Sequence, residues 1–114
     1  MTALHTTKFK FSYSHVTVVD KPVLHLSSMT ADADIIVCGV GQSGLLLPEM
    51  IKSGAVIIDA GTSEAGGKIL GDADLRCAQA ASIFTPVPGG VGPITVAMIF
   101  KNLCILTATH RESL

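Results

Sequence analysis

One short stretch holds the residues that are best placed to bind a ligand. It reads Thr85-Pro86-Val87-Pro88-Gly89-Gly90-Val91-Gly92-Pro93-Ile94-Thr95. Its prolines fix φ and remove N–H groups, so the loop is stiff, whereas its glycines leave the backbone open to close approach. Pro93 suits the first position of a helix, and the amides around Gly90 to Gly92 would then bind an anion or polar group at the helix N-terminus. The alternative is a tight turn followed by a helix that starts at proline.

A second glycine-rich stretch, Gly39-Val40-Gly41-Gln42-Ser43-Gly44, has the G-x-G-x-x-G spacing of a dinucleotide-binding loop. Asp59 lies about twenty residues further on, where that fingerprint places an acid for a ribose hydroxyl. The long helix that should follow is interrupted, because Pro48 lies within Leu45 to Lys52. We therefore expect a glycine turn that lines a cofactor crevice at the carboxyl edge of a sheet, rather than the pyrophosphate loop itself.

Three further acidic residues have positions that suggest a role. Asp20 precedes Lys21 at the end of a β-branched run, where an acid would accept a hydrogen bond from the ribose of NAD. Capping of the following turn by Asp20 is the alternative. Asp72 and Asp74 are interpreted as a helix N-cap and a first-turn acid.

The histidines and cysteines are scattered along the chain. They lack the spacing of a metal site, a catalytic triad or a disulfide framework. We therefore expect no metal site, and we interpret the cysteines as small core residues. These residues are His5, His15, His25, His110, Cys38, Cys77 and Cys104.

Composition limits the class of protein. The chain has 114 residues, of which 48% are apolar and 15% charged, and its formal net charge is −1. These values predict one globular domain and give no electrostatic case for binding nucleic acid or an anionic membrane. Gly, Asp, Lys or Pro interrupts each apolar run before it reaches transmembrane length, and the first residues do not resemble a secretory signal. We expect a cytoplasmic protein.

Apolar runs of strand length alternate with helical patterns, which predicts a parallel α/β sheet. The residues 8–14 alternate with period two and form a further candidate strand. The expected strands are 16–19, 35–40, 55–60 and 83–85, and the expected helices are 23–32, 48–52, 73–81 and 93–108.

The proline-glycine stretch resembles the signature of the bifunctional methylenetetrahydrofolate dehydrogenase/methenyltetrahydrofolate cyclohydrolase family. Four other stretches resemble that family in the same order along the chain. They are Ala33-Asp34-Ile35-Ile36-Val37, Val40-Gly41, Ile51 to Asp59, and Gly71-Asp72-Ala73-Asp74. The resemblance runs from about Val16 to Leu106 and covers only the C-terminal part of a chain more than twice as long.

The resemblance implies a partial Rossmann-like fold. It would have a mostly parallel sheet with helices on both faces, and it would lack the first strand and the fingerprint loop. Residues 1–15 would be a divergent segment, and residues 16–114 a partial NAD(P)-binding domain. The segment 8–14 would pair with strand 16–19 in place of the missing strand, or strand 16–19 would close directly on strand 35–40. The last helix, apolar on nearly every face, predicts a homodimer or another form of self-association.

The resemblance also implies a function and its residues. The family oxidises 5,10-methylenetetrahydrofolate with NAD(P) and hydrolyses the 5,10-methenyl product. A tetrahydrofolate derivative would contact Pro88, Gly89, Gly90, Val91 and Gly92. The cofactor, NADP or NAD, would contact Asp20, Lys21, Gly41, Thr62 and Thr95. Members that use NADP typically carry His-Ser or a similar pair where this chain has Asp20-Lys21, so the preference between the two cofactors stays open.

No catalytic residue is assigned. The family's proton-handling Lys and its neighbouring Tyr lie in an N-terminal domain, and this chain contains no Tyr-x-x-x-Lys. Alternatives to a part of the folate enzyme are therefore a stand-alone nucleotide-binding or complementing module, and an inactive remnant. A stand-alone module would bind the nucleotide without turnover, whereas an inactive remnant would bind neither nucleotide nor folate.

Overall fold

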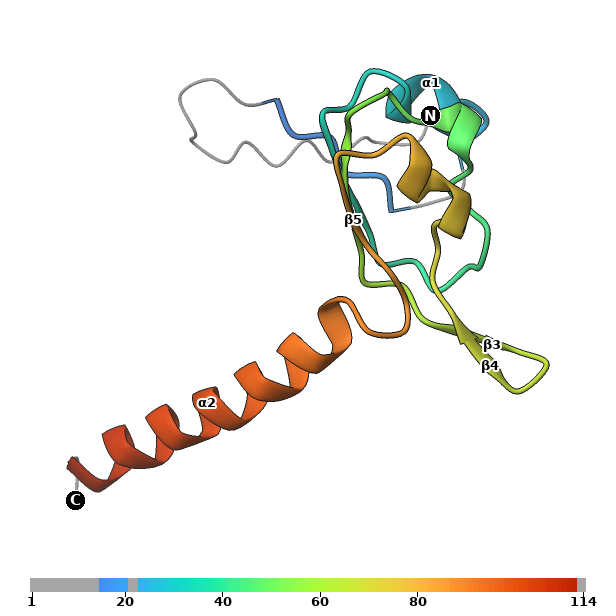
Figure 1. Ribbon diagram of the computed structural model, residues 1–114. Coiled ribbons are helices and arrows are strands. Elements are labelled where there is room, and N and C mark those ends of the chain that lie inside the picture. The colour runs from blue at the N-terminus through green and yellow to red at the C-terminus, as the bar shows by residue number, and fades with distance from the viewer. Residues whose placement is uncertain (1–14, 21–22, 113–114) are drawn as a thin grey trace.

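A three-stranded parallel sheet organises the computed structural model, which describes residues 15–20 and 23–112 (Figure 1). The strands are β1 (Ile35–Cys38), β2 (Val56–Asp59) and β5 (Ile83–Thr85), in the order β1-β2-β5. In register, Ile35 lies beside Val56, which lies beside Ile83. The predicted parallel α/β sheet is confirmed, and its strands are shorter than expected at both β1 and β2.

Short helical segments and a hairpin connect the strands. The helix α1 (Leu26–Thr30) and the 3-10 turns η1 (Pro48–Met50) and η2 (Leu75–Gln79) pack beside the sheet. Strands β3 (Ser63–Ala65) and β4 (Lys68–Leu70) form an antiparallel hairpin. Its turn is Gly66-Gly67, and both glycines have positive φ, as two-residue hairpin loops require.

The core lies on one face of the sheet. Ile57 is fully buried in β2, and Cys38 is buried at the end of β1. Both pack with Leu46, Ala73 and Cys77 from the segments that cover this face. Burial raises the pKa of the Cys38 thiol to about 12, so this cysteine stays protonated and belongs to the core, as predicted.

The opposite face of the sheet is open within the described residues. Ile35, Val37 and Ile83 project from that face and are each more than half exposed. The expected layer of helix on this face is not formed there, because the helix that follows β5 leaves the sheet instead of returning over it (Figure 1). The described part therefore has helices on one face only.

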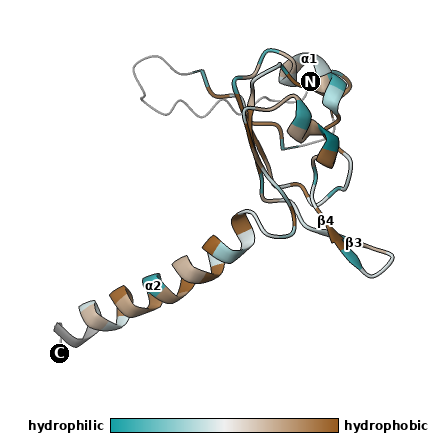
Figure 2. Cartoon of the chain, in the orientation of Figure 1, coloured by the Kyte–Doolittle hydropathy of each residue, from teal (hydrophilic) through white to brown (hydrophobic). Residues whose placement is uncertain are grey.

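The last helix, α2 (Val91–Glu112), extends away from the rest of the molecule. From Gly92 to Thr109 every residue is exposed, and hydrophobic residues recur along the whole length of the helix (Figure 2). By length and composition Val91–Thr109 is sufficient to cross a membrane, so the expectation that no segment reaches that length is wrong. A charged Lys101 and an amide at Asn102 lie at the middle of that span, where polar side chains are costly in hydrocarbon.

Several local expectations are corrected. Residues 15–20 form no strand, so the predicted strand 16–19 is wrong, and it does not pair with β1. An isolated β-branched run has no ladder to satisfy its backbone groups, so its sequence alone cannot hold it extended in a sheet. The candidate strand 8–14 lies outside the described residues.

The predicted helix over 73–81 is replaced by η2, and its cap is Asp74 rather than Asp72. The Asp74 carboxylate accepts a hydrogen bond from the Arg76 amide at 2.8 Å, and the Arg76 guanidinium holds the pKa of this partly exposed carboxyl at about 2. The amides of Asp72 and Ala73 donate instead to Asp59, which keeps these two residues out of a helix. Helix α2 likewise starts at Val91 rather than at Pro93, which lies in its first turn. The N–H groups of the first turn have no acceptor within the helix, so the missing N–H of Pro93 costs no hydrogen bond there.

Candidate functional site

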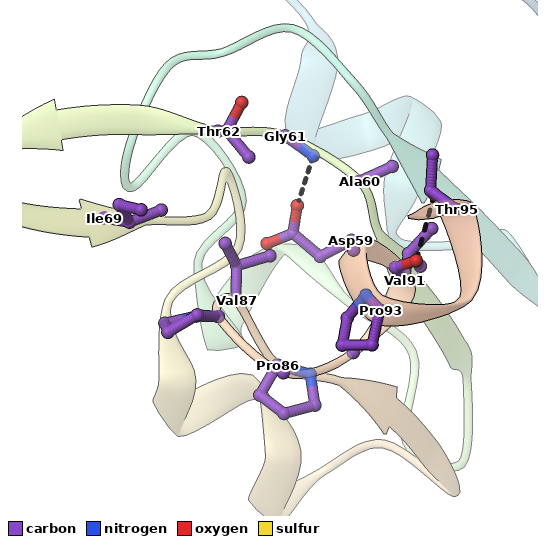
Figure 3. Close-up of a pocket in the computed structure, with 14 residues that line it drawn as sticks. Asp59, Ala60, Gly61, Thr62, Ile69, Pro86, Val87, Val91, Pro93 and Thr95 are labelled. Carbon is purple, nitrogen blue, oxygen red and sulfur yellow. Dashed lines mark hydrogen bonds between the residues drawn. The ribbon is translucent and has the colours of Figure 1, made fainter. Parts of the chain in front are cut away.

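The loops that follow β1, β2 and β5 meet at one edge of the sheet, because the strands are parallel. A pocket of about 440 Å³ opens there. One wall is the loop from Pro86 to Pro93 together with Thr95, and the other is Asp59 to Thr62 with Ile69 from the hairpin (Figure 3). Ligands of open α/β sheets bind outside the carboxyl ends of the strands, so this pocket is the candidate site.

Close backbone packing holds the proline-glycine wall in place. The Gly90 amide donates to the Pro86 carbonyl at 2.8 Å. A Cβ atom added at Gly90 would lie 2.6 Å from that carbonyl oxygen, so the turn tolerates no side chain there. Gly89 has φ +105°, and nothing lies within 4 Å of a Cβ built on it or on Gly92. The glycine backbone is thus fixed on one side and open on the other.

The start of α2 forms the end of this wall. The first amides of a helix have no acceptor inside it, so Val91 and Gly92 offer N–H groups at the positive end of the helix dipole. Pro93 removes one N–H from the same turn. The Thr95 hydroxyl donates to the Val91 carbonyl at 3.0 Å, so this side chain folds onto its own helix (Figure 3).

The opposite wall is anchored by the buried carboxylate of Asp59, which is only 1% exposed. It accepts hydrogen bonds from Gly61 at 3.0 Å (drawn in Figure 3) and from Ala73 at 2.8 Å. The Thr85 hydroxyl lies 2.8 Å from the Asp59 amide and links β5 to the same point. A carboxylate held this way fixes the turn that carries Thr62, and it is not free to bind a ribose.

The predicted site residues are brought together to different degrees. All five of the residues expected to contact folate line the pocket, together with Thr62 and Thr95. Gly41 lies beside this group, since a Cβ atom there would be 3.3 Å from the Thr62 carbonyl oxygen. Asp20 is exposed and does not line the pocket, and Lys21 lies outside the described residues.

The structure also explains why the G-x-G-x-x-G stretch is not a pyrophosphate loop. The amides of Val40 and Gln42 donate to the Asp72 carboxylate at 2.6 and 2.7 Å, and the Gly41 amide donates to it at 3.2 Å. These three N–H groups are therefore already bonded and are not free for a phosphate. Sequence reasoning missed Ile69, whose only signal was its place after the Gly66-Gly67 turn.

Comparison with known families gives one consistent result. Residues 3–111 match the family model "Tetrahydrofolate dehydrogenase/cyclohydrolase, NAD(P)-binding domain". The chain belongs to this family. This family acts on tetrahydrofolate derivatives, and the matched domain is its NAD(P)-binding domain.

Individual relatives agree with the family match. The chain is 46% identical over 93 residues to "Bifunctional protein FolD 2" of Lactobacillus johnsonii, which covers 81% of this chain and 33% of that protein. It is 48% identical over 90 residues to "Bifunctional protein FolD" of a Sulfurihydrogenibium species, which covers 78% and 32%. The chain therefore spans about a third of the length of the relatives that it matches.

Solved structures of the same family share the fold. The bifunctional enzyme FolD of Campylobacter jejuni superposes with a TM-score of 0.72 at 40% identity, over 78% of this chain and 32% of that one. The Trypanosoma brucei enzyme, solved with NADP and an inhibitor, gives a TM-score of 0.66 at 39% identity, over 75% and 32%. The Rossmann-like fold and the family predicted from the proline-glycine motif are confirmed.

The residues present fit part of an NAD(P) site. The pocket beside Thr62 has the open glycine backbone that a flat ring needs for close approach. In the loop after β1 the amides of Val40, Gly41 and Gln42 already donate to Asp72, so these three are not free for a pyrophosphate. No cluster of three or more metal-binding side chains occurs among residues 15–20 and 23–112.

Proposed function

We propose that this chain forms the cofactor-binding part, and one wall of the folate site, of an enzyme for one-carbon folate metabolism. The reaction would be the NAD(P)-dependent oxidation of 5,10-methylenetetrahydrofolate, followed by hydrolysis of the 5,10-methenyl product. The observation that carries this proposal is the pocket at the carboxyl edge of the sheet, where the family's proline-glycine loop faces Thr62 and Ile69. The family match supports the reaction class.

The proline-glycine wall is suited to a flat, polar-edged ring such as a pterin. Pro88 and Val91 give the wall an apolar surface, and Gly89 and Gly92 let a ring approach the backbone. The free amides at the start of α2 can donate to acceptors on the edge of the ring. We assign substrate binding to Pro88, Gly89, Gly90, Val91 and Gly92 on this basis.

The cofactor's part is limited by what the chain offers. When bound, NAD(P) accepts a hydride from the folate. In this proposal Thr62 and Gly41 border the nicotinamide, and Ile69 and Val87 exclude water from the pocket. The cofactor is NADP or NAD, and Asp20 and Lys21 would contact its adenine ribose, where the Asp20 carboxylate can accept a hydrogen bond from a hydroxyl.

Turnover is not expected from this chain by itself. Among the described residues, Asp59 is the one acidic residue that lines the pocket. Its carboxylate already accepts hydrogen bonds from three backbone N–H groups, so it is not available as a general base. The purified chain should therefore bind NADH or NADPH without catalysing oxidation. Fluorescence titration of the reduced nucleotides, with and without folate, measures this. Saturable nucleotide binding whose affinity changes in the presence of folate supports the proposal. The absence of saturable binding of NADH and NADPH contradicts it.

We further propose that the chain is a cytoplasmic protein that self-associates through α2 and binds neither nucleic acid nor membrane. The exposed apolar side chains of α2 support self-association, because monomeric proteins rarely leave so large an apolar patch in water. They include Ile94, Val96, Met98, Ile99, Phe100, Leu103, Ile105 and Leu106. A net charge of −1 and Lys101 at the middle of the helix argue against the other partners.

Light scattering at increasing protein concentration tests self-association. Phe100 is 65% exposed on α2, so Phe100→Glu places a charge on the apolar surface. We expect this change to raise the concentration of half-association about tenfold or more, since burying an unpaired carboxylate is costly. The neighbouring Lys101→Glu introduces the same side chain at a position that is already charged, and it should have little effect. A wild-type mass that stays monomeric up to millimolar concentration would refute the proposal.

A further inference from the structure

The loop from Gly39 to Gly44 surrounds a carboxylate of the chain itself. Both oxygens of Asp72 accept backbone hydrogen bonds, one from Gln42 at 2.7 Å and the other from Val40 at 2.6 Å and Gly41 at 3.2 Å. The side chain is 0% exposed. Among the described residues, no lysine or arginine forms a salt bridge with Asp72.

This arrangement is that of an anion-binding loop. Successive N–H groups that converge on one point form a concave site for an anion, which in phosphate-binding loops comes from the ligand. Positive φ at Gly41 and Gly44, of 79° and 72°, gives the backbone the necessary turn. In this chain the anion is the side chain of Asp72, which is 32 residues from Val40 along the sequence.

A second loop is shaped around the same carboxylate. A Cβ atom at Gly61 would lie 2.1 Å from Cγ of Asp72, so only glycine leaves room for the Asp72 side chain. Reciprocally, a Cβ atom at Gly71 would lie 2.1 Å from Oδ2 of Asp59. The Asp72 carboxylate is therefore fitted between the turn after β1 and the turn after β2, which are the two turns that carry Gly41 and Thr62.

We propose that Asp72 is a positioning residue whose carboxylate takes the place of a bound phosphate in this loop. It closes the loop to external phosphate and holds Gly41 against Thr62 as one wall of the crevice. The statement about the cofactor rests on the proposed function, whereas the statement about the anion does not. Removal of the carboxylate should release the three loop amides and leave a site for a small external anion.

Asp72→Ala tests the anion directly, with sodium formate as the probe. We expect hydrogen exchange at Val40 and Gln42 to accelerate at least about tenfold, since charge-assisted bonds are lost. Formate should reverse the acceleration and raise the melting temperature in a saturable manner, and sodium chloride at equal ionic strength should not. Asp74→Ala removes the same group two residues further on, from a partly exposed cap, and it should show no formate effect.

Asp72→Asn keeps the shape of the side chain and serves if the alanine variant does not fold. It should loosen the loop amides while the hydrogen bonds between β1 and β2 stay protected, and it should weaken NADH or NADPH binding about fivefold or more relative to Asp74→Asn. Loop amides that stay as protected as in the wild type, in either variant, would overturn the proposal. The proposal would also be overturned if the loop amides exchanged faster in a variant while its affinity for the nucleotide stayed unchanged. If the wild type binds no nucleotide, the proposed function fails, and amide exchange and the formate response still decide the role of Asp72.

Discussion

Gly90→Ala is expected to lower the free energy of unfolding by about 2–4 kcal/mol and to displace the proline-glycine wall of the pocket. A Cβ atom there would lie 2.6 Å from the Pro86 carbonyl oxygen and 2.9 Å from Cβ of Thr85. The first neighbour is backbone and the second is held in β5, so neither can move away cheaply. The turn must open instead, and the hydrogen bond from the Gly90 amide to Pro86 is lost with it.

Gly92→Ala is the matched control, two residues further along the same loop. Nothing lies within 4 Å of a Cβ atom built on Gly92, and its place in the first turn of α2 suits alanine. Its stability should be unchanged or higher by up to about 1 kcal/mol, from helix propensity. Urea unfolding followed by circular dichroism gives both values. Equal stability of the two variants would show that the turn is not packed as described.

Asp59→Ala is expected to have the largest effect on folding. It removes the acceptor of three buried amides, those of Gly61, Asp72 and Ala73. A buried N–H left without a partner costs about 1–3 kcal/mol, so the sum approaches the whole stability of a typical small domain. We expect the variant to be largely unfolded at room temperature, with loss of the cooperative transition in thermal melts.

Asp34→Ala serves as its control, because that carboxylate is exposed and pairs with Lys52 at the surface. Surface ion pairs contribute about 0–1 kcal/mol, so this variant should melt close to the wild type. A higher melting temperature for Asp59→Ala than for Asp34→Ala would contradict the role given to Asp59. A folded Asp59→Ala variant with a wild-type melting curve would do so by itself.

The sequence predicted the parallel sheet and the position of the pocket, since both follow from local patterns. Unbroken apolar runs at 35–40 and 55–60 indicate strands of a parallel sheet, and the proline-glycine motif begins where the last expected strand, 83–85, ends. Parallel strands bring their following loops to one edge, which is why Thr62 and Gly90 line one pocket although they are far apart in sequence. The family resemblance rested on the same motif and is confirmed.

The remaining features depend on contacts between distant residues, which no local pattern reports. Asp72 has the sequence context of a helix cap, and only the packing of Gly61 shows that its carboxylate enters the loop after β1. The run at 16–19 has strand propensity but lacks a neighbouring strand, so it forms none. The direction of α2 is equally invisible in its sequence, because a helix apolar on every face fits either a covered or a projecting position.

The central claim is that the amides and glycines from Gly89 to Gly92 form a wall for a folate ring. The most direct measurement is a titration of the isotope-labelled chain with folate, followed through backbone amide NMR shifts. The account predicts saturable shifts concentrated at Gly89 to Gly92 and at Thr62, with the amides of β1 unaffected. Saturable shifts confined to other parts of the chain, or none at millimolar folate, would contradict it.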